Sequence, residues 1–409
     1  QLVTDVNYIM TPGKGFAATH ANIGFISGNQ YKYNFNGAFN NGHITSPLAN
    51  NAANVNHWNL VGNPYPCAID VDSLFTTNAS VMNKAVYMWS HYRPPLATNP
   101  GNEVLNFSQS DYVIINESGP LGNGNDINYD GVVNGLDIPE PYIPSGQSFF
   151  VSSLVANNLT FNNSMRISGL NSNNQFFKDN NVTKGANENP IHRIWLNLTS
   201  DNGIFSQILV AYLEGATDRY DGMSYDAERI ESISRMTSIY TTINSENDKR
   251  FAIQGKAPKS LKLSEVIPVG FKTDINVPTL YKFSLPKYDG SFFETNTIYL
   301  KDKLLNTLHS LKDSDYVFTS EVGEFNNRFE IVFREKGIGK PTERVNKNAV
   351  STLKIIELQN GNIQFVLNST FELKNIRILD LQGKTIYNLK ANGQSNVFNL
   401  SNLRQTIYI

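Results

Sequence analysis

One stretch of the chain carries side chains with the types and spacing of a cation-binding loop. A hard cation such as Ca²⁺ takes about six to eight oxygen ligands, and residues at alternating loop positions bring those oxygens to one point. Oxygen-bearing side chains stand at positions 1, 3, 5, 9 and 12 of a twelve-residue segment, glycine stands at position 6, and position 7 offers a carbonyl group: Asp126, Asn128, Asp130, Asn134, Asp137, Gly131 and Val132. The spacing therefore predicts a bound calcium ion.

The residues that follow this loop set it apart from a helix–loop–helix calcium site. The short Asp137 at position 12 makes the loop resemble dockerin-type calcium loops. Pro139 and Pro141 exclude an ordinary exiting helix, because proline lacks the N–H group and its ring clashes with the preceding turn. We expect a structural ion, since every candidate ligand is used in coordination. The alternative is an Asn/Asp/Gly-rich hairpin loop without a metal.

Residue types suited to catalysis are present but scattered. The six histidines form no paired metal-binding motif, and the single cysteine, Cys67, is interpreted as a buried small residue. Acids gather in the segment Glu214–Asp221 and again at Asp226 and Glu228. Two carboxylates beside aromatic rings could form a glycosidase site, whereas a solvated acidic loop is the alternative. We expect no enzymatic activity from this chain.

Composition excludes several classes of partner. The chain has 409 residues, 17% of them charged, and a net charge of −2. This balance gives no electrostatic surface for nucleic acid or for an anionic membrane. The lone cysteine cannot form a disulfide within the chain. We find no apolar run of about 18 residues, so we expect no membrane span.

Short alternating segments joined by Asn- and Gly-rich turns predict an all-β fold. Residues 1–165 form the first predicted domain, a β-sandwich that contains the calcium-like loop. Asn41-Gly42 is typical of a hairpin turn, and short helical turns are expected at Asp72–Thr77 and Val81–Lys84. The expected strands are Tyr31–Phe35, Trp58–Gly62, Ala85–Ser90, Asp111–Ile115 and Gly146–Val151.

A second antiparallel β-sandwich is predicted over residues 190–335, between linkers at 166–189 and 336–348. Its last strand alternates strictly, with Phe329, Ile331 and Phe333 on one face. The other strands expected here are Ile194–Leu198, Phe205–Tyr212, Tyr281–Leu285, Thr297–Leu300 and Tyr316–Thr319. Strands at such spacing, without long helices between them, favour a sandwich.

The final segment, residues 349–409, contains a hairpin pattern that breaks at Gly383 and resumes at Ile386. The run from Ile376 to Tyr387 resembles the core of the C-terminal sorting domains of the Bacteroidetes type IX secretion system. The resemblance implies a small Ig-like β domain, here expected to be truncated, that delivers the protein through the outer membrane. The motif positions that carry this implied sorting signal are Ile376, Asp380, Gly383 and Lys384.

Segments further upstream also resemble parts of large flavobacterial surface proteins, most specifically Trp58–Pro66. The family implies a non-catalytic region of a secreted or cell-surface protein, related to adhesion or gliding. Its implied partners are the type IX translocon, the translocon's outer-membrane shuttle barrel, and a glycan or other surface ligand. The alternative is a carbohydrate-binding or accessory region of a polysaccharide-degrading enzyme whose catalytic domain lies upstream.

Two further positions bear on glycans. Asp72-Ser73-Leu74 resembles the O-glycosylation acceptor sequence of Bacteroidetes, which implies a modified Ser73. Trp89, with Tyr92 and Arg93, could form a platform on which a sugar stacks. Because Tyr87 and Trp89 share one face of their strand, we expect at least one of the two to pack into the core.

Overall fold

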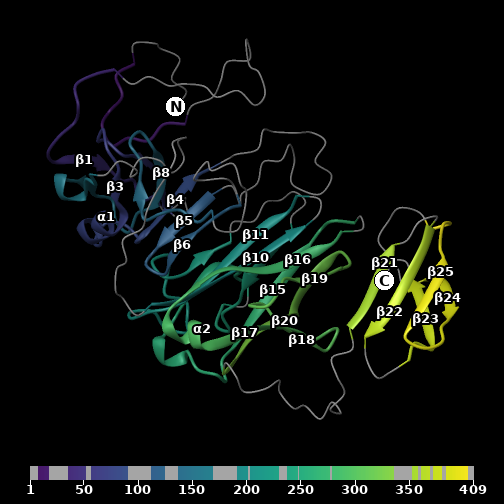
Figure 1. The fold of residues 1–409 in the computed structure, drawn as a ribbon. Helices are drawn as coiled ribbons and strands as arrows, with labels where there is room; N and C mark the ends of the chain where they lie inside the picture. Colours follow the sequence, from purple (N-terminus) through teal and green to yellow (C-terminus); the bar gives the residue numbers. More distant parts are fainter. Residues whose placement is uncertain are drawn as a thin grey trace. The chain divides into compact units, whose positions relative to one another are not determined.

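The computed structural model confirms an all-β protein (Figure 1). It divides into two compact units, Gln1–Lys336 and Gly337–Ile409, and each is described here by itself. The structure describes residues 8–17, 36–51, 57–90, 112–124, 137–168, 191–200, 203–229, 237–246, 248–276, 279–335, 352–357, 361–368, 372–379 and 384–403. The expected strand Tyr31–Phe35 and both predicted linkers, apart from residues 166–168, lie outside these ranges.

The first half of unit 1 is built on a five-stranded sheet of order β2-β8-β4-β5-β6. Two short antiparallel pairs, β1–β9 and β3–β7, accompany it. The bounds are β1 Ile44–Pro47, β2 Trp58–Gly62, β3 Ile69–Asp70, β4 Ala85–Trp89, β5 Tyr112–Asn116, β6 Gly119–Leu121, β7 Tyr142–Ile143, β8 Ser148–Ser152 and β9 Asn158–Phe161. Four of the expected strands are thus confirmed.

One helix, α1 (Val71–Asn78), covers a face of this sheet. It begins at Asp70, whose carboxylate accepts the Ser73 N–H at 2.7 Å and so satisfies a donor of the first turn. Leu74 and Phe75 point into the core, which they share with β1, β9 and the sheet. The expected helical turn at Val81–Lys84 is wrong, because these residues form a turn and an isolated bridge.

Asn41-Gly42 is not a hairpin turn, contrary to the prediction. Gly42 does adopt the left-handed conformation, with a φ of 79°. The strand that starts at Ile44 pairs with β9 instead of folding back on the preceding residues. Tyr65 fixes the turn, since its hydroxyl donates to the Gly42 carbonyl at 2.6 Å.

The second half of unit 1 is a long sheet that bends over itself. Its order is β18-β17-β20-β15-β13-β14-β11-β10-β16-β19, with β12 beside β14. All pairs are antiparallel except β11–β14, which is parallel. The bounds are β10 His192–Ser200, β11 Phe205–Tyr212, β12 Ala227–Glu228, β13 Thr237–Thr241, β14 Phe251–Lys256, β15 Val266–Thr273, β16 Tyr281–Asp289, α2 Ser291–Thr295, β17 Asn296–Asp302, β18 Thr307–Ser310, β19 Tyr316–Phe318 and β20 Gly323–Glu335.

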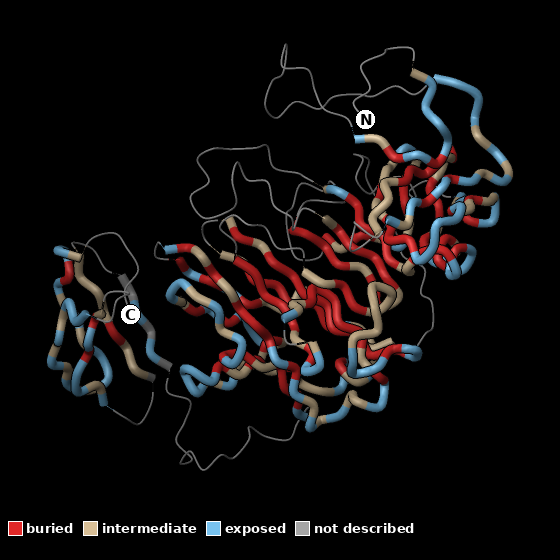
Figure 2. The backbone as a smooth tube through the Cα atoms, turned by 180° about the vertical axis from the view of Figure 1, so that it is seen from behind, coloured by how far each residue is buried: buried red, intermediate tan, exposed pale blue. Residues whose placement is uncertain are grey.

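The bend brings the two halves of this sheet around one hydrophobic core. β13 and β14 share only the pair Thr241–Phe251, so the sheet folds there. Alternate residues of β10, β11 and β16 face alternate residues of β15, β17 and β20. The predicted alternation in β20 is confirmed, because Phe329, Ile331 and Phe333 are all fully buried in this core. Figure 2 shows buried residues, in red, concentrated along the central strands of unit 1.

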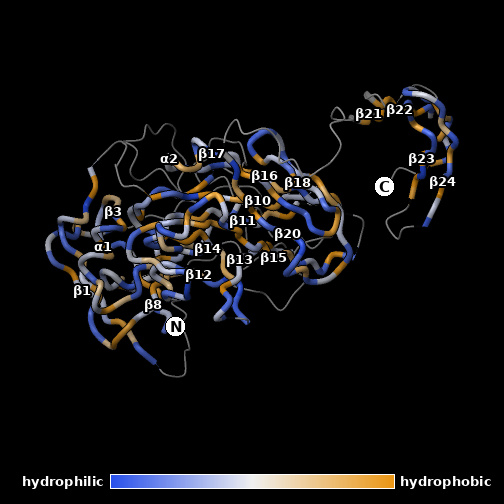
Figure 3. Tube along the Cα trace, turned by 90° about the horizontal axis from the view of Figure 1, so that it is seen from below, coloured by the Kyte–Doolittle hydropathy of each residue, from blue (hydrophilic) through white to orange (hydrophobic). Residues whose placement is uncertain are grey.

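The two halves of unit 1 also share a hydrophobic core. The outer face of β10, β11 and β14 packs on β4, β5 and β6 through buried side chains. Figure 3 shows the hydropathy of the residues along these parts of the chain. The buried Trp195 crosses this contact and donates its indole N–H to the Pro120 carbonyl at 2.8 Å. The sheets of the predicted first and second domains therefore pack on each other, and the two predicted domains belong to one compact unit.

The described residues of unit 2 form five strands. A three-stranded sheet, β21-β22-β25, and the hairpin β23–β24 enclose a core around Phe365, Ile376, Ile378 and Leu400. The bounds are β21 Thr352–Glu357, β22 Asn362–Asn368, β23 Asn375–Leu379, β24 Thr385–Lys390 and β25 Ser395–Asn399. The hairpin predicted for Ile376–Tyr387 is confirmed, and the described residues contain no helix long and apolar enough to cross a bilayer.

Candidate functional site

The calcium-like loop lies almost wholly outside the described residues. Asp126, Asn128, Asp130, Val132 and Asn134 fall there, and only Asp137 is described. Asp137 is 4% exposed, and its main chain packs so closely on Gly122 that a Cβ at Gly122 would lie 2.3 Å from the Asp137 carbonyl oxygen. The loop thus ends on a firmly held residue. Calcium binding stays a prediction, and the described ranges hold no group of three or more His, Cys, Asp or Glu side chains that could bind a metal ion.

Calcium removal tests the predicted site. If the loop binds Ca²⁺, a hundredfold excess of the ion over its dissociation constant stabilises the protein by about 2.7 kcal/mol. We expect EDTA to lower the melting temperature measured by calorimetry, and Ca²⁺ but not Mg²⁺ at equal concentration to restore it. The variant Asp130→Ala should lose this response, whereas Asp313→Ala, outside the loop, should keep it. An unchanged melting temperature in EDTA would contradict the site.

The predicted sorting residues lie at the hairpin of unit 2. Ile376 is on β23 and points into the small core, where it is 9% exposed. Lys384 immediately precedes β24 and is exposed. Asp380 and Gly383, between them in the sequence, lie outside the described residues. One motif position therefore holds the hairpin in place, and another faces solvent.

Ser73 lies in the first turn of α1 and is half-buried. Its main-chain N–H is bound to the Asp70 carboxylate. Burial raises the pKa of the neighbouring Asp72 above its usual value, and the nearby Asp70 carboxylate adds to this effect. The acceptor sequence thus sits in a folded helix end. O-glycosylation of Ser73 stays a prediction.

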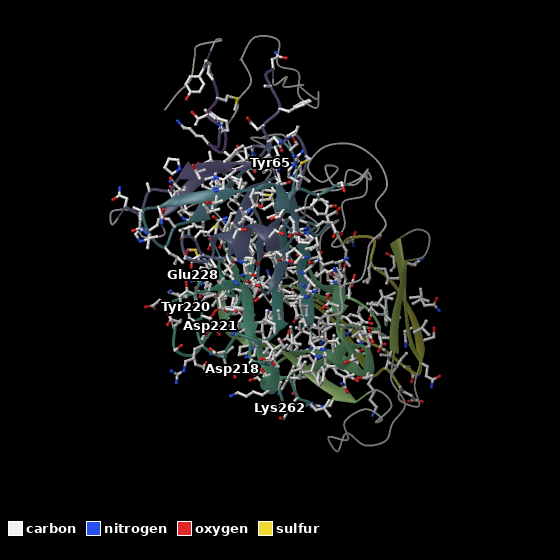
Figure 4. All side chains as sticks on the ribbon, turned by 90° about the vertical axis from the view of Figure 1, so that its left-hand side faces the viewer. Tyr65, Asp218, Tyr220, Asp221, Glu228 and Lys262 are labelled. Atoms are coloured by element: carbon white, nitrogen blue, oxygen red, sulfur yellow. The ribbon has the colours of Figure 1, made fainter. Side chains whose placement is uncertain are left out.

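The acidic segment forms an ordered loop between β11 and β12. The Asp221 carboxylate accepts the Thr217 N–H at 2.6 Å and the Thr217 hydroxyl at 2.8 Å. Asp218 accepts a hydrogen bond from Ser260 and lies 3.6 Å from the Lys256 ammonium. Figure 4 shows these acids along one edge of unit 1. Both carboxylates hold the loop in shape, as structural acids do.

Asp226 is the buried centre of this loop. It is fully buried, and its two oxygens accept the main-chain N–H groups of Asp221 at 2.7 Å and Gly255 at 3.0 Å. Burial raises the pKa of the Asp226 carboxyl to about 7, although the two N–H donors act in the opposite direction. Asp226 therefore ties the loop to β14 and titrates near neutral pH. Asp226 was one of the acids considered from the sequence, but nothing in the sequence predicts that it is buried.

The raised pKa of Asp226 predicts a pH-dependent stability. The folded state binds the proton more tightly than the unfolded state, so stability falls as the pH rises from about 4 to about 7. The expected slope is roughly 1.4 kcal/mol per pH unit from this group. Asp226→Asn should remove that slope and leave a constant offset. Urea unfolding of the natural sequence and of Asp226→Asn at pH 5 and pH 8 measures this slope. The same change in stability with pH for both proteins would contradict a raised pKa of Asp226.

Glu228 lies beside the same loop and is engaged by a lysine. The Lys249 ammonium is 2.9 Å from the Glu228 carboxylate and 3.9 Å from the centroid of the Tyr220 ring. Burial raises the pKa of the Tyr220 phenol, and the Glu228 charge adds to this effect. The acids considered as a glycosidase pair therefore each bind a neighbouring group: Asp218, Asp221, Asp226 and Glu228. This favours a role of these acids in holding the loop in shape.

Cys67 is half-buried rather than fully buried, contrary to the expectation. The Arg166 Nε donates to the Cys67 Sγ at 3.2 Å, and the guanidinium lies over the Tyr65 ring, 5.4 Å from its centroid. The Arg166 side chain also donates to Asn41 at 3.0 Å. Arg166 thus connects its own segment to Asn41 and to the turn that contains Tyr65 and Cys67.

The aromatic platform expected at Trp89 is partly described. Tyr87 is buried, at 3% exposed, while Trp89 is 46% exposed, so the expectation that at least one of them packs inside is confirmed. Tyr92 and Arg93 lie outside the described residues. Trp58, Tyr112 and Phe150 join Trp89 and Tyr87 instead. Sequence spacing missed these three because they come from other strands.

One comparison with known proteins gives a match. A family model described as a domain of unknown function, DUF8693, matches residues 2–333. No curated protein and no solved structure matched the chain. The matched range ends close to the boundary between the two units at Lys336 and Gly337.

Proposed function

This chain belongs to the DUF8693 family of domains of unknown function, and we propose that it is the surface-delivered region of a secreted protein, with unit 2 as its export signal. In this proposal the type IX secretion machinery recognises unit 2 and carries unit 1 across the outer membrane. The proposed role of unit 1 is recognition at the cell surface and not catalysis.

The observation that carries the proposal is the independence of unit 2. It has its own hydrophobic core, and the family match ends at residue 333, before unit 2 begins. A signal that is read separately from its cargo needs such a body, because it must fold whatever precedes it. The run from Ile376 to Tyr387, which resembles the core of the type IX sorting domains, lies within unit 2.

The hairpin of unit 2 separates structural from exposed motif positions. Ile376 and Ile378 are buried on one face of β23, and Arg377 between them is exposed. Lys384 is exposed at the start of the returning strand. In the proposal the buried positions maintain the hairpin and the exposed Lys384 contacts the carrier, whose strands can pair with sheet edges of unit 2.

Deletion of residues 337–409 tests the export role. We expect the shortened protein, expressed in a Bacteroidetes host that has the type IX machinery, to accumulate in the periplasm with a loss of surface delivery of at least tenfold. The physical reason is that unit 1 keeps its own cores and folds, but lacks the recognised hairpin. Protease accessibility on intact cells and cell fractionation give the measurement.

A double variant separates recognition from folding. Lys384→Ala combined with Asp380→Ala should block export while unit 2 stays folded. Arg377→Ala is the matched control, because it removes an exposed cation from the same hairpin outside the motif. Surface delivery of the deleted form at the normal level would refute the proposal.

A further inference from the structure

The asparagine–glycine pairs of the chain differ in how firmly the structure holds them. Those that lie wholly within the described residues are Asn36-Gly37, Asn41-Gly42, Asn123-Gly124 and Asn392-Gly393. In such a pair the main-chain nitrogen of glycine can approach the side-chain carbonyl carbon of asparagine, because glycine has no Cβ to obstruct it. Whether the two groups can meet depends on the contacts that each pair makes.

Asn41-Gly42 is held by hydrogen bonds at both of these groups. The Asn41 Oδ1 accepts the Arg166 Nη1–H at 3.0 Å, and the Gly42 N–H donates to the Asn163 Oδ1 at 3.0 Å. The Gly42 carbonyl also accepts the Tyr65 hydroxyl at 2.6 Å. The glycine nitrogen and the asparagine side chain must therefore be released before they can react.

Asn123-Gly124 is restrained by burial. Asn123 is 7% exposed, and its side-chain N–H donates to the Ser90 carbonyl at 2.8 Å. The Phe205 ring packs directly on Gly124, since a Cβ at residue 124 would lie 2.3 Å from a carbon of that ring. Neither the side chain nor the main chain of this pair can rotate without disturbing the packing.

Asn392-Gly393 lies in the turn between β24 and β25. The Asn392 N–H donates to the Asn396 Oδ1 at 2.8 Å, and the Gly393 carbonyl accepts the Leu373 N–H at 2.8 Å. Open space surrounds Gly393, but these bonds fix the main chain on both sides of the pair. This pair is thus restrained less than the two before it.

Asn36-Gly37 has none of these restraints. Both residues are exposed, as are Ala38 and Phe39 after them. A Cβ at Gly37 would meet no atom within 4 Å, and no described residue hydrogen-bonds the Gly37 N–H or the Asn36 side chain. The two groups therefore reach a reactive geometry by local rotation alone.

We propose that Asn36 is a site of spontaneous deamidation. The Gly37 main-chain nitrogen attacks the Asn36 side-chain carbonyl carbon and closes a cyclic imide, while the side-chain nitrogen leaves as ammonia with the proton from Gly37. Water then breaks one of the two C–N bonds of the imide, which gives aspartate or isoaspartate. No electrons are transferred, and water is the only other reactant. The product adds one negative charge to the exposed segment before β1. This modification does not depend on the export role of unit 2.

Peptide mapping of the full chain after incubation at pH 8 tests the modification. Cleavage at aromatic residues separates Asn36 from Asn41, because Phe39 lies between them, and heavy-oxygen water labels each converted residue for mass spectrometry. We expect Asn36 to convert at least about tenfold faster than Asn41, which must first lose two hydrogen bonds. Asn123 and Asn392 should also convert more slowly than Asn36. In urea the four rates should become similar, since unfolding removes the restraints.

Asn163→Ala tests the restraint on Asn41 itself. Asn163 is exposed, and its replacement leaves the Gly42 N–H without its acceptor, so Asn41 should convert about two- to tenfold faster than in the natural sequence. Asn402→Ala, which removes an exposed asparagine elsewhere, should leave every rate unchanged. Equal rates at Asn36 and Asn41 in the folded protein, no conversion at Asn36, or an Asn41 rate that Asn163→Ala does not alter would overturn the inference.

Discussion

Replacement of Arg328 by methionine is expected to lower the free energy of unfolding by about 3–5 kcal/mol, since it leaves a buried carboxylate without its cation. Asp302 and Arg328 are 0% and 5% exposed at their side chains. The Arg328 Nη2 lies 3.0 Å from one Asp302 oxygen, and the Nε contacts both oxygens at 3.2 and 3.3 Å. Among the ion pairs of the described residues, the pair of Arg328 and Asp302 has the least exposed side chains.

The Asp302 carboxylate accepts hydrogen bonds from other groups as well as from Arg328. It accepts the Tyr316 hydroxyl at 3.0 Å and the main-chain N–H groups of Leu304 and Leu305 at 2.9 and 3.2 Å. The Arg328 guanidinium also lies over the Phe318 ring, 4.9 Å from its centroid. The pair thus joins β17, β19 and β20 and closes the β17–β18 hairpin, so its loss disturbs several strands together.

Urea unfolding of four variants measures this network: Arg328→Met, Asp302→Asn, their combination and a control. Lys282→Met is the matched control, because Lys282 and Asp315 form a pair at 3.0 Å with side chains 46% and 44% exposed. An exposed pair of this kind contributes about 0–1 kcal/mol. Asp302→Asn combined with Arg328→Met should lose less stability than the two single variants added together, by about 1 kcal/mol or more. Additive losses, or an Arg328→Met effect no larger than that of Lys282→Met, would contradict the proposed network.

Strands with regular alternation could be predicted from the sequence. β10 and the second half of β20 were expected because apolar residues alternate along them, whereas β4 and β11 were expected from short apolar runs that are buried on both faces. The hairpin β23–β24 was also expected, since a glycine breaks its alternation. The pattern in these segments is local and therefore visible without tertiary contacts.

The central strands of the long sheet escaped prediction for a physical reason. β15 contains Pro268 and Gly270, which normally weaken a strand, and β14 contains Gly255. These residues are tolerated because tertiary neighbours supply what they lack: Tyr240 covers Gly270, and Asp226 accepts the Gly255 N–H. Such compensation comes from residues distant in the chain and leaves no local signal.

The candidate sites divide in the same way. The β23–β24 hairpin, a contiguous pattern, could be predicted from spacing, whereas the calcium-like loop stays a prediction. The ring contacts around Trp89 could not be predicted, because Trp58, Tyr112 and Phe150 join Trp89 only through strand order β2-β8-β4-β5. The burial of Asp226 likewise depends on β12, which directly follows it, lying beside β14.

Gly270→Ala is expected to cost about 3 kcal/mol of stability, near the upper part of the range for overpacking a core. Gly270 is directly opposite Tyr240 in the β13–β15 pairing. A Cβ at residue 270 would lie 2.0 Å from a carbon of the Tyr240 ring, far inside van der Waals contact. Either the ring or the strand must therefore move.

Movement of the ring is opposed on several sides. Tyr240 is fully buried, and its hydroxyl is hydrogen-bonded to Glu324 at 2.9 Å and Asn326 at 2.7 Å. The Arg250 guanidinium lies 5.2 Å from the ring centroid and pairs with Glu324 at 2.6 Å. To relieve the clash, the protein must break these contacts or shift β15, which pairs with β20 on its other edge.

A comparison of glycine variants isolates the clash from general effects of substitution. Gly42→Asn is the control, because open space surrounds Gly42 and asparagine tolerates its left-handed conformation. It should change stability by less than about 1 kcal/mol. Tyr240→Ala removes the ring, so Gly270→Ala introduced on that background should have little further effect. Equal destabilisation by Gly270→Ala on both backgrounds in urea unfolding would show that the ring is not the obstacle.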